Sequence, residues 1–338
     1  MSTRITVGVL GATGALGKEL LSVLDRSPWR PDEVVPFASR ATQIPYVSYG
    51  DSSVAVEDFS AGALGELDLL FLTAPSEACL AAAAIAADEG VPVVDASGAL
   101  SDDGAPLVVP WVNPEVLQTE EPLSAVSIPS AGASLLGATL APLLRAGLVR
   151  DVDATLLLPA SHWGRRGLDE LSAQVVAMFN SGTPPRKVFE SGLAFDLLPL
   201  VGSLGASGRS STEDRIIIEL SELLGLRQAP RVEVLGVPVF SGITATVRVA
   251  LTRQTDPGLV HRILIDGGLK VSEDVRSLPR PRRVEGKPFP DIGRLRLEED
   301  RLTLLAGFDN LRGSAAAAVA AGGVLLRQRG VELGRDAG

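Results

Sequence analysis

The chain has little cysteine, no excess of positive charge and no long apolar run. Its single cysteine, Cys79, excludes a disulfide within the chain and a zinc site built from several thiolates. The formal net charge of −10 argues against a nucleic-acid backbone as partner. The longest apolar stretches, 80–87 and 315–326, are too short to span a bilayer, and the first residues lack the layout of a signal peptide. We therefore expect a soluble, cytoplasmic protein with neither a nucleic-acid nor a membrane partner.

The composition is that of a folded chain. Of its 338 residues, 46% are hydrophobic and 21% are charged, and no low-complexity polar tract interrupts them. This is enough apolar material for a sizeable core, and the length suits two domains of ordinary size.

The first part of the chain alternates between strand-like and helix-like segments. Residues 5–10 form a short β-branched apolar run, which is typical of a buried parallel strand. Further strands are expected at 34–39, 67–73, 91–95, 107–110 and 125–128, and helices at 18–26 and 76–89. This alternation predicts a doubly wound parallel sheet, the Rossmann arrangement.

The pattern changes after about Pro129. Helices are expected at 131–144, 165–180, 213–224 and 312–327, with another beginning at Asp256-Pro257. Strands are expected at 154–158, 231–240, 244–251, 294–297 and 301–305. Long strands mixed with helices predict a second, α+β domain with a mostly antiparallel sheet.

A glycine-rich segment lies between the first expected strand and helix. Gly11 permits a tight turn, Gly14 lets the backbone approach a pyrophosphate, and Gly17 lets the helix pack close to its strand. In this context we expect the segment to bind a nicotinamide dinucleotide through Gly11, Ala12, Thr13, Gly14, Ala15, Leu16 and Gly17. The alternative is a turn with a purely structural role.

The end of the second expected strand distinguishes between cofactors. An acidic residue there would bind the ribose hydroxyls of NAD, whereas this chain has Ser39 and Arg40, which suit a 2′-phosphate. We therefore favour NADP over NAD; the alternative is that Arg40 is a solvated loop cation.

Five segments in order along the chain resemble the aspartate-semialdehyde dehydrogenase family. They are 11–17 with Ala38-Ser39-Arg40, Asp95–Leu100, Pro106–Pro114, Val237–Phe240 and Asp309–Arg312. The resemblance implies a cofactor domain at 1–128 and 308–338, closed by the C-terminal helix. It also implies an inserted dimerisation and substrate domain at 129–307, which forms a homodimer. Asn310 matches a family position near the cofactor.

The family's reaction requires a cysteine thiolate that attacks the aldehyde, and a histidine that acts as base. The resemblance places Ser130 at the cysteine position and Ile243 at the histidine position. A serine hydroxyl needs a strong neighbouring base, and its ester would be a poorer acyl donor to phosphate. The chain therefore lacks both groups at the positions where the family has them.

Four further family positions also differ. The arginine that holds the substrate carboxylate corresponds to Gly236, a glutamine to Leu158, a phosphate-site arginine to Ser101 and a lysine to Arg215. This pattern resembles the Usg-like branch of the family. We therefore expect a pseudoenzyme that binds NADP or NAD and dimerises but does not oxidise aspartate semialdehyde with phosphate.

Two alternatives stay open. The chain could be an active NAD(P)-dependent oxidoreductase of amino-acid biosynthesis acting on an aldehyde or oxo group, with His162 approaching Ser130 or binding an anion beside Arg165 and Arg166. It could also keep the cleft only as a scaffold for a protein partner. Cys79 is not at the nucleophile position, and we expect it to be a buried structural thiol.

Overall fold

The computed structural model describes residues 4–39 and 44–333. The chain divides into two compact units, a first that combines Met1–Pro129 with Ser314–Gly338 and a second at Ser130–Gly313. Compactness alone does not establish that a unit folds independently. The domain limits expected from the sequence, 1–128 with 308–338 and 129–307, therefore remain predictions.

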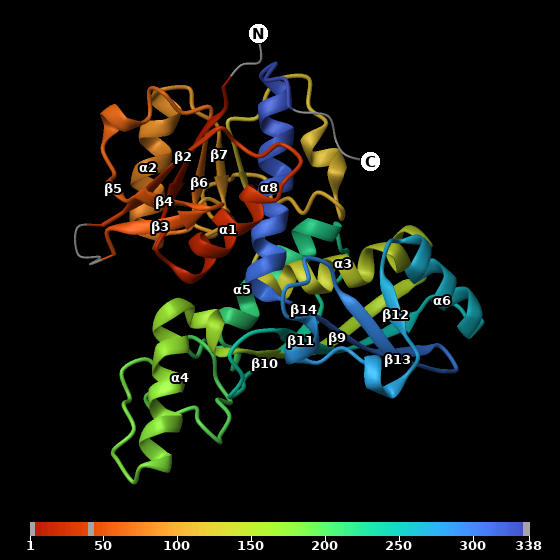
Figure 1. Ribbon diagram of the computed structural model, residues 1–338. Helices are drawn as coiled ribbons and strands as arrows, with labels where there is room; N and C mark the ends of the chain where they lie inside the picture. The colour runs from red at the N-terminus through yellow and green to blue at the C-terminus, as the bar shows by residue number, and fades with distance from the viewer. Residues whose placement is uncertain (1–3, 40–43, 334–338) are drawn as a thin grey trace. The chain divides into compact units, whose positions relative to one another are not determined.

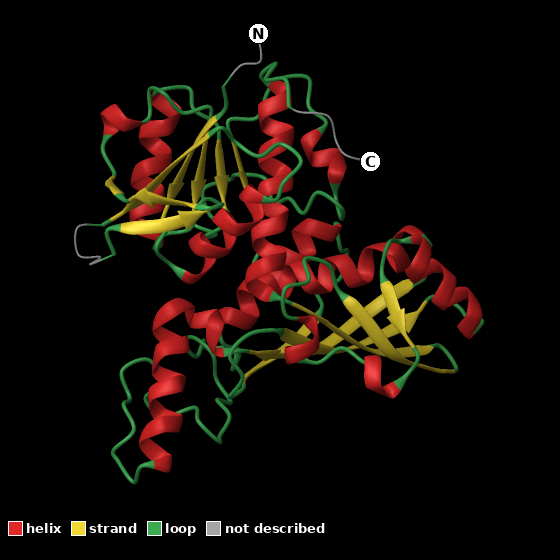
Figure 2. Ribbon diagram, viewed as in Figure 1, coloured by secondary structure: helices red, strands yellow, loops and turns green. Residues whose placement is uncertain are grey.

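The first unit is built on a parallel sheet of six strands, in the order β5-β2-β1-β6-β7-β8. Their bounds are β1 Thr6–Leu10, β2 Glu33–Ala38, β5 Glu57–Asp58, β6 Leu69–Leu72, β7 Val93–Asp95 and β8 Ala125–Ser127. The central strand β1 aligns Val7 with Val34 on one side and with Leu69 on the other. The predicted doubly wound parallel sheet is confirmed (Figures 1 and 2).

Helices cover both faces of this sheet. Helix α1 (Ala15–Asp25) and the C-terminal α8 (Asn310–Gln328) share one apolar core with Phe71 of β6, whereas α2 (Ser76–Asp88) packs against Leu70. Neighbouring residues of β6 thus face opposite cores, as expected for a strand buried on both sides. Smaller elements complete the unit: the β3–β4 hairpin (Tyr46–Tyr49 and Ser52–Ala55), η1 (Ala61–Ala63) and η2 (Pro114–Leu117).

The strand expected at 107–110 is wrong. Only Leu107 pairs with the sheet, in a single bridge to Ser127. Pro110 has no N–H to donate, and the Asn113 amide accepts from Val109 N at 2.9 Å and donates to Leu107 O at 2.9 Å. The side chain of Asn113 therefore replaces the neighbouring strand as hydrogen-bond partner and bends the segment.

The second unit has a mixed six-stranded sheet in the order β10-β9-β11-β14-β13-β12. Its strands are β9 Val149–Leu158, β10 Arg231–Gly236, β11 Ile243–Leu251, β12 Lys270–Ser272, β13 Asp291–Glu298 and β14 Arg301–Phe308. The central pairings β9–β11, β11–β14 and β14–β13 are antiparallel, and the outer pairings β10–β9 and β13–β12 are parallel. The predicted, mostly antiparallel sheet is confirmed.

Three helices lie against one face of this sheet. Leu136 of α3 (Ala131–Arg145), Leu220 of α5 (Ser211–Leu224) and Leu264 of α6 (Pro257–Asp266) belong to one core with the inward side chains of β9 and β11. The remaining elements are η3 (Ala160–Trp163), α4 (Gly164–Phe179), η4 (Val275–Ser277) and α7 (Pro281–Val284). Within 4–39 and 44–333, no helix combines the length and apolarity needed to cross a membrane.

Helix α5 begins two residues earlier than the sequence suggested. The Ser210 hydroxyl accepts from Glu213 N at 3.1 Å, and the Glu213 carboxylate accepts from Ser210 N at 2.7 Å. This reciprocal pair is a capping box, whose Ser-x-x-Glu signature is present in the sequence. The carboxylate of Glu213 also accepts from Val234 N at 3.0 Å and so attaches the helix to β10.

Candidate functional site

The glycine turn of the first unit leaves no room for side chains. Gly11 has φ +88°, and a Cβ there would lie 2.7 Å from Ala74 N. A Cβ on Gly17 would lie 2.2 Å from Gly11 O, whereas one on Gly14 would lie 3.2 Å from the same oxygen. Gly11 and Gly17 are therefore required by the close packing of the turn itself, and Gly14 is less constrained by the protein.

The turn presents the start of α1 to a ligand. Gly14 is the N-cap of α1, and no side chain caps that helix among the described residues. Thr13, Gly14, Ala15 and Leu16 are half-buried, whereas Ala12 and Gly17 are buried. Uncapped amides at a helix N-terminus attract an anion such as a pyrophosphate. The residues present fit the phosphates of a dinucleotide, which when bound would supply the hydride acceptor.

The residues expected to choose the cofactor lie at the end of β2. Ser39 directly follows the strand and is exposed. Arg40 lies outside the described residues. The preference for NADP over NAD therefore stays a prediction from the sequence.

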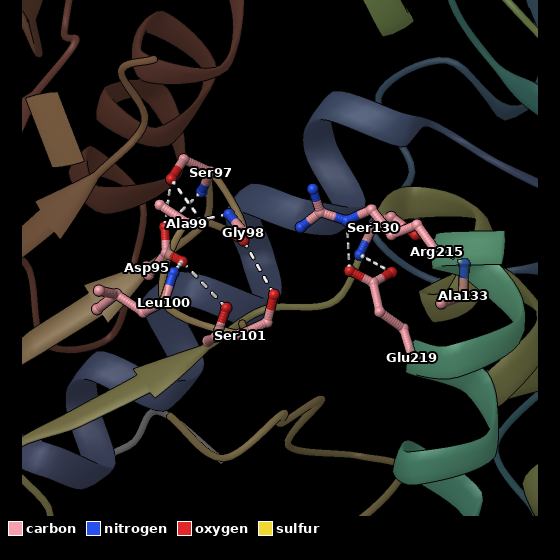
Figure 3. A network of polar contacts seen from close by, with 11 residues as sticks. Asp95, Ser97, Gly98, Ala99, Leu100, Ser101, Ser130, Ala133, Arg215 and Glu219 are labelled. Atoms are coloured by element: carbon pink, nitrogen blue, oxygen red, sulfur yellow. Dashed lines mark hydrogen bonds and ion pairs between the residues drawn. The ribbon is translucent and has the colours of Figure 1, made fainter. Parts of the chain in front are cut away.

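A buried carboxylate organises the loop after β7 (Figure 3). Asp95 has no exposed surface and accepts hydrogen bonds from Ser97 N at 2.8 Å, Gly98 N at 3.1 Å and Leu100 N at 2.8 Å. It also accepts from the hydroxyls of Ser97 at 2.6 Å and Ser127 at 3.1 Å. Asp95 thus shapes the whole 95–100 segment, and the indication in the sequence was its place two residues before Ser97-Gly98.

In the second unit, Ser130 is the N-cap of α3. Its hydroxyl accepts from Ala133 N at 3.4 Å, a long hydrogen bond. Its backbone N–H donates to Glu219 Oε2 at 2.9 Å, and Arg215 Nε donates to Glu219 Oε1 at 2.8 Å (Figure 3). Glu219 is 3% exposed, so a buried carboxylate on α5 fixes the backbone at the predicted nucleophile position. Glu219 was not predicted, and its i, i+4 spacing from Arg215 was the one indication of it in the sequence.

His162 carries a neutral imidazole at neutral pH. It lies in η3, where its ring meets that of Trp163 edge-on with centroids 5.0 Å apart. Desolvation by the surrounding protein, and secondly the positive charge of Arg215, lower the pKa of His162 to about 4, although the residue as a whole is exposed. Among the hydrogen bonds of the described chain, none joins His162 to Ser130.

The position predicted for the family's histidine lies in the core. Ile243 begins β11, has no exposed surface and belongs to the same apolar cluster as Leu136. Gly236 ends β10, and a Cβ there would lie 3.0 Å from Trp163 Cη2 and 3.1 Å from Leu198 Cβ. Both positions are therefore packed by apolar side chains.

Three other positions predicted from the resemblance, Leu158, Ser101 and Asn310, either lie in the apolar core or form hydrogen bonds within their own unit. Leu158, at the glutamine position, is 2% exposed and belongs to the core. Ser101 donates its hydroxyl to Gly98 O at 2.9 Å within the same loop. Asn310 is 6% exposed, and its Oδ1 accepts from Ser161 Oγ at 3.0 Å and Gly242 N at 3.2 Å. The side-chain oxygen of Asn310 thus accepts hydrogen bonds from within the second unit. The predicted contact of Asn310 with a cofactor would therefore have to come from its side-chain nitrogen.

Cys79 is a thiol within the apolar core around α2. It has no exposed surface, lies 3.2 Å from Ala74 O, and burial raises its pKa. A raised pKa disfavours the thiolate, which is the reactive form.

Comparisons with known proteins agree with this architecture. Residues 6–120 match the family described as "Semialdehyde dehydrogenase, NAD binding domain", and residues 140–313 match "Semialdehyde dehydrogenase, dimerisation domain". A USG-1 protein homolog of Pseudomonas aeruginosa is 34% identical over 265 residues, which cover 78% of this chain and 79% of that protein. The aspartate-semialdehyde dehydrogenase of Rickettsia bellii is 28% identical over 324 residues, covering 94% and 96% of the two chains.

A solved structure extends the likeness to three dimensions. The probable aspartate-semialdehyde dehydrogenase from Pseudomonas aeruginosa superposes with a TM-score of 0.89 and 31% identity, covering 96% of this chain and 99% of that one. Two matched domains in the family's order, a relative more than 30% identical and the same fold over the full length all agree. The chain therefore belongs to the semialdehyde dehydrogenase family and carries its NAD-binding and dimerisation domains.

Proposed function

We propose that this protein binds NADP or NAD, forms a homodimer and does not carry out the phosphorylating oxidation of aspartate semialdehyde. The proposal rests on the predicted family positions together with one observation. The resemblance places Ser130 at the thiolate position and Ile243 at the base position, and Ile243 is a core residue with no exposed surface. Phosphorylating dehydrogenation needs a nucleophile that is also a good leaving group. A serine without an adjacent base provides neither property.

The surroundings of Ser130 support a structural role for it. Its hydroxyl is directed to the first turn of α3, and its N–H is held by Glu219. The neutral imidazole of His162 would be a weak base with a pKa near 4, and the charge of Arg215 opposes its protonation. A base that resists protonation cannot readily accept the serine proton.

The missing substrate contacts point the same way. Gly236 cannot bind a carboxylate through a side chain, and Trp163 occupies the adjacent space. Ser101 has no charge to hold phosphate, and its hydroxyl is used within its own loop. The substrate carboxylate and the phosphate would thus both lack the cations that the family provides.

The test measures turnover and cofactor binding on the same preparation. Purified protein is mixed with NADP, phosphate and aspartate semialdehyde, and reduction of the cofactor is followed by absorbance, with the Rickettsia bellii relative as positive control. We expect binding of NADP or NAD by calorimetry and no turnover. Turnover of even about one per second, an ordinary enzyme rate, would contradict the proposal.

The dimer and the cofactor preference have separate measurements. We expect light scattering to give twice the mass of the 35.2 kDa chain. We expect NADP to bind more tightly than NAD, and Arg40→Ala to remove most of that difference, because a guanidinium suits a 2′-phosphate. Equal affinities in the unmodified protein would contradict the preference without affecting the proposal about catalysis. The proposed soluble, cytoplasmic state, free of nucleic acid and membrane, is checked by fractionation of cells.

The second candidate is an oxidoreductase acting on another aldehyde or oxo substrate. It rests on the half-buried Ser130 at a helix N-terminus and on the nearby charge of Arg215. A screen of small aldehydes and oxo acids with NADPH and NADH distinguishes the two. Turnover that is abolished in Ser130→Ala would favour this candidate.

A further inference from the structure

A cavity of about 440 Å³ lies in the second unit, and none of the site residues described above lines it. Residues of helix α6 line one part of it, and residues of and directly after the parallel pair β12–β13 line the rest. Figure 1 shows where α6, β12 and β13 lie in the second unit. Pockets for small molecules span roughly 300–1,000 Å³. This cavity is at the lower end of that range and suits a small metabolite rather than a dinucleotide.

An irregularity in β13 places an arginine at this cavity. The register of β13 against β14 shifts between Gly293 and Arg296, so one extra residue is inserted. Within it, Arg294 has φ +52°, a left-handed conformation that is unfavourable for a residue with a long side chain. A bulge of this kind re-aims a side chain and is frequent beside functional sites.

The guanidinium of Arg294 is free to bind a ligand. Its side chain is exposed, lines the cavity and makes no hydrogen bond or ion pair with any residue in 4–39 or 44–333. A planar guanidinium presents several N–H donors and binds a carboxylate through two parallel hydrogen bonds.

A carboxylate lines the same cavity. Glu273 follows β12, is 83% exposed at its side chain and lies 3.3 Å from His261 Nε2 through Oε1. A carboxylate has about four lone-pair positions, so one contact to an imidazole leaves room for an ammonium group. The buried Ser272, at 6% exposure, adds a hydroxyl that has no hydrogen bond to the described residues.

We propose that this cavity binds an α-amino acid with a short apolar side chain. Arg294 would take its carboxylate, Glu273 its ammonium, and the apolar residues Pro257, Val271 and Leu295 its side chain. The opposite charges of the two residues match a zwitterion. A doubly charged anion such as phosphate is disfavoured because Glu273 would repel it.

Two pairs of variants test the proposal. L-Valine, L-alanine and L-isoleucine are titrated into the full-length protein by calorimetry and by saturation-transfer NMR, beside isobutylamine, isovalerate and inorganic phosphate. We expect a valine-type amino acid to bind and its amine or acid analogue to bind at least about tenfold more weakly. Arg294→Gln and Glu273→Gln should each weaken amino-acid binding by about tenfold or more.

Matched controls separate binding from folding. Arg296→Gln removes an exposed cation two residues away that does not line the cavity, and binding should be unchanged. Arg294→Gly removes the charge but adopts φ +52° without strain, so it should lose binding while the resistance to unfolding stays equal or rises. No binding of the three amino acids at 10 mM, set as roughly the weakest useful affinity, would overturn the proposal. So would amino-acid binding that neither Arg294→Gln nor Glu273→Gln weakens, or phosphate that binds the unmodified protein more tightly than all three amino acids do.

Discussion

Asp95 and Glu219 are both buried carboxylates that hold a loop in place, but they do so over different distances along the chain. Asp95 accepts five hydrogen bonds, and four of them come from within the next five residues. Glu219 accepts from Arg215, one helical turn away, and from Ser130, which is 89 residues away. The donors to Asp95 are all neutral groups, whereas Glu219 also forms an ion pair with the guanidinium of Arg215.

The difference shows which kinds of site a sequence can disclose. A carboxylate that binds the amides of its own loop leaves a local pattern, here Asp95-Ala-Ser-Gly98. A carboxylate that reaches across the fold leaves no such pattern, because its partner is set by how α3 and α5 pack. Replacing each carboxylate and measuring the free energy of unfolding shows how much each of the two kinds of contact stabilises the fold.

The largest effect is expected for Asp95→Ala. The substitution leaves three backbone N–H groups and two hydroxyls without their acceptor, and all of these donors except those of Ser97 are buried. At 1–3 kcal/mol for each unsatisfied buried group that water cannot reach, we expect a loss of at least about 3 kcal/mol in the free energy of unfolding. Denaturant titration measures it, and a loss under about 1 kcal/mol would contradict the network as described.

Glu219→Ala should cost less, about 2 kcal/mol. One backbone N–H, that of Ser130, loses its acceptor, and Arg215 is 41% exposed, so water replaces much of its ion pair. Glu219→Gln keeps an acceptor oxygen for Ser130 and is the matched control, with less than half of the loss. Equal losses for the two variants would show that the charge, rather than the hydrogen bond, holds this loop.

The glycine turn offers a graded version of the same comparison. Gly17→Ala forces a Cβ to 2.2 Å from a backbone oxygen, whereas Gly14→Ala meets the same oxygen at 3.2 Å. We expect Gly17→Ala to cost about 2 kcal/mol or more and to abolish dinucleotide binding. Gly14→Ala should fold nearly as the unmodified protein and weaken only cofactor affinity, as calorimetry would show. If Gly14→Ala left cofactor affinity unchanged, the phosphates would have to bind elsewhere than over Gly14.

The smallest effect on stability is expected at His162. Its pKa of about 4 lies below the ordinary value of 6.5, so the unfolded chain binds the proton more readily. The folded state should therefore lose stability as the pH falls from 6.5 toward 4, and His162→Gln should reduce that loss. The protein has two histidines, so NMR titration with His162→Gln and His261→Gln assigns both signals.

The same titration examines the charge beside Glu219. Arg215→Gln removes the second cause of the shift and should raise the pKa of His162 part of the way, because desolvation remains. An unchanged midpoint would mean that Arg215 acts only on Glu219.

The spacing of apolar residues, and the glycine, proline and capping residues between segments, predicted most of the fold. The parallel sheet followed from buried apolar runs such as 5–10, and the glycine turn from its place between a strand and a helix. The strand at 107–110 was wrong because a side-chain amide, Asn113, competes with the sheet for the same backbone groups. Helix α5 begins earlier than predicted because the capping box of Ser210 and Glu213 sets its first turn.

The candidate site was less predictable than the fold. The resemblance predicts site positions for Ser130 and Ile243, whereas the hydrogen bond of Glu219 to Ser130 depends on tertiary packing. Likewise, nothing in the sequence around Arg294 indicated its left-handed backbone, since a bulge is set by the register of the neighbouring strand.

The close packing at Gly236 has a consequence for the order of mutations. Trp163 lies against the space where any side chain at residue 236 would begin. An arginine introduced there first would meet the indole and destabilise the strand end, whereas a smaller residue at 163 introduced first would open a path. A larger residue at 236 should therefore be tolerated better in a chain whose residue 163 is already smaller, so the order in which the two substitutions are made affects the stability of the intermediate variant.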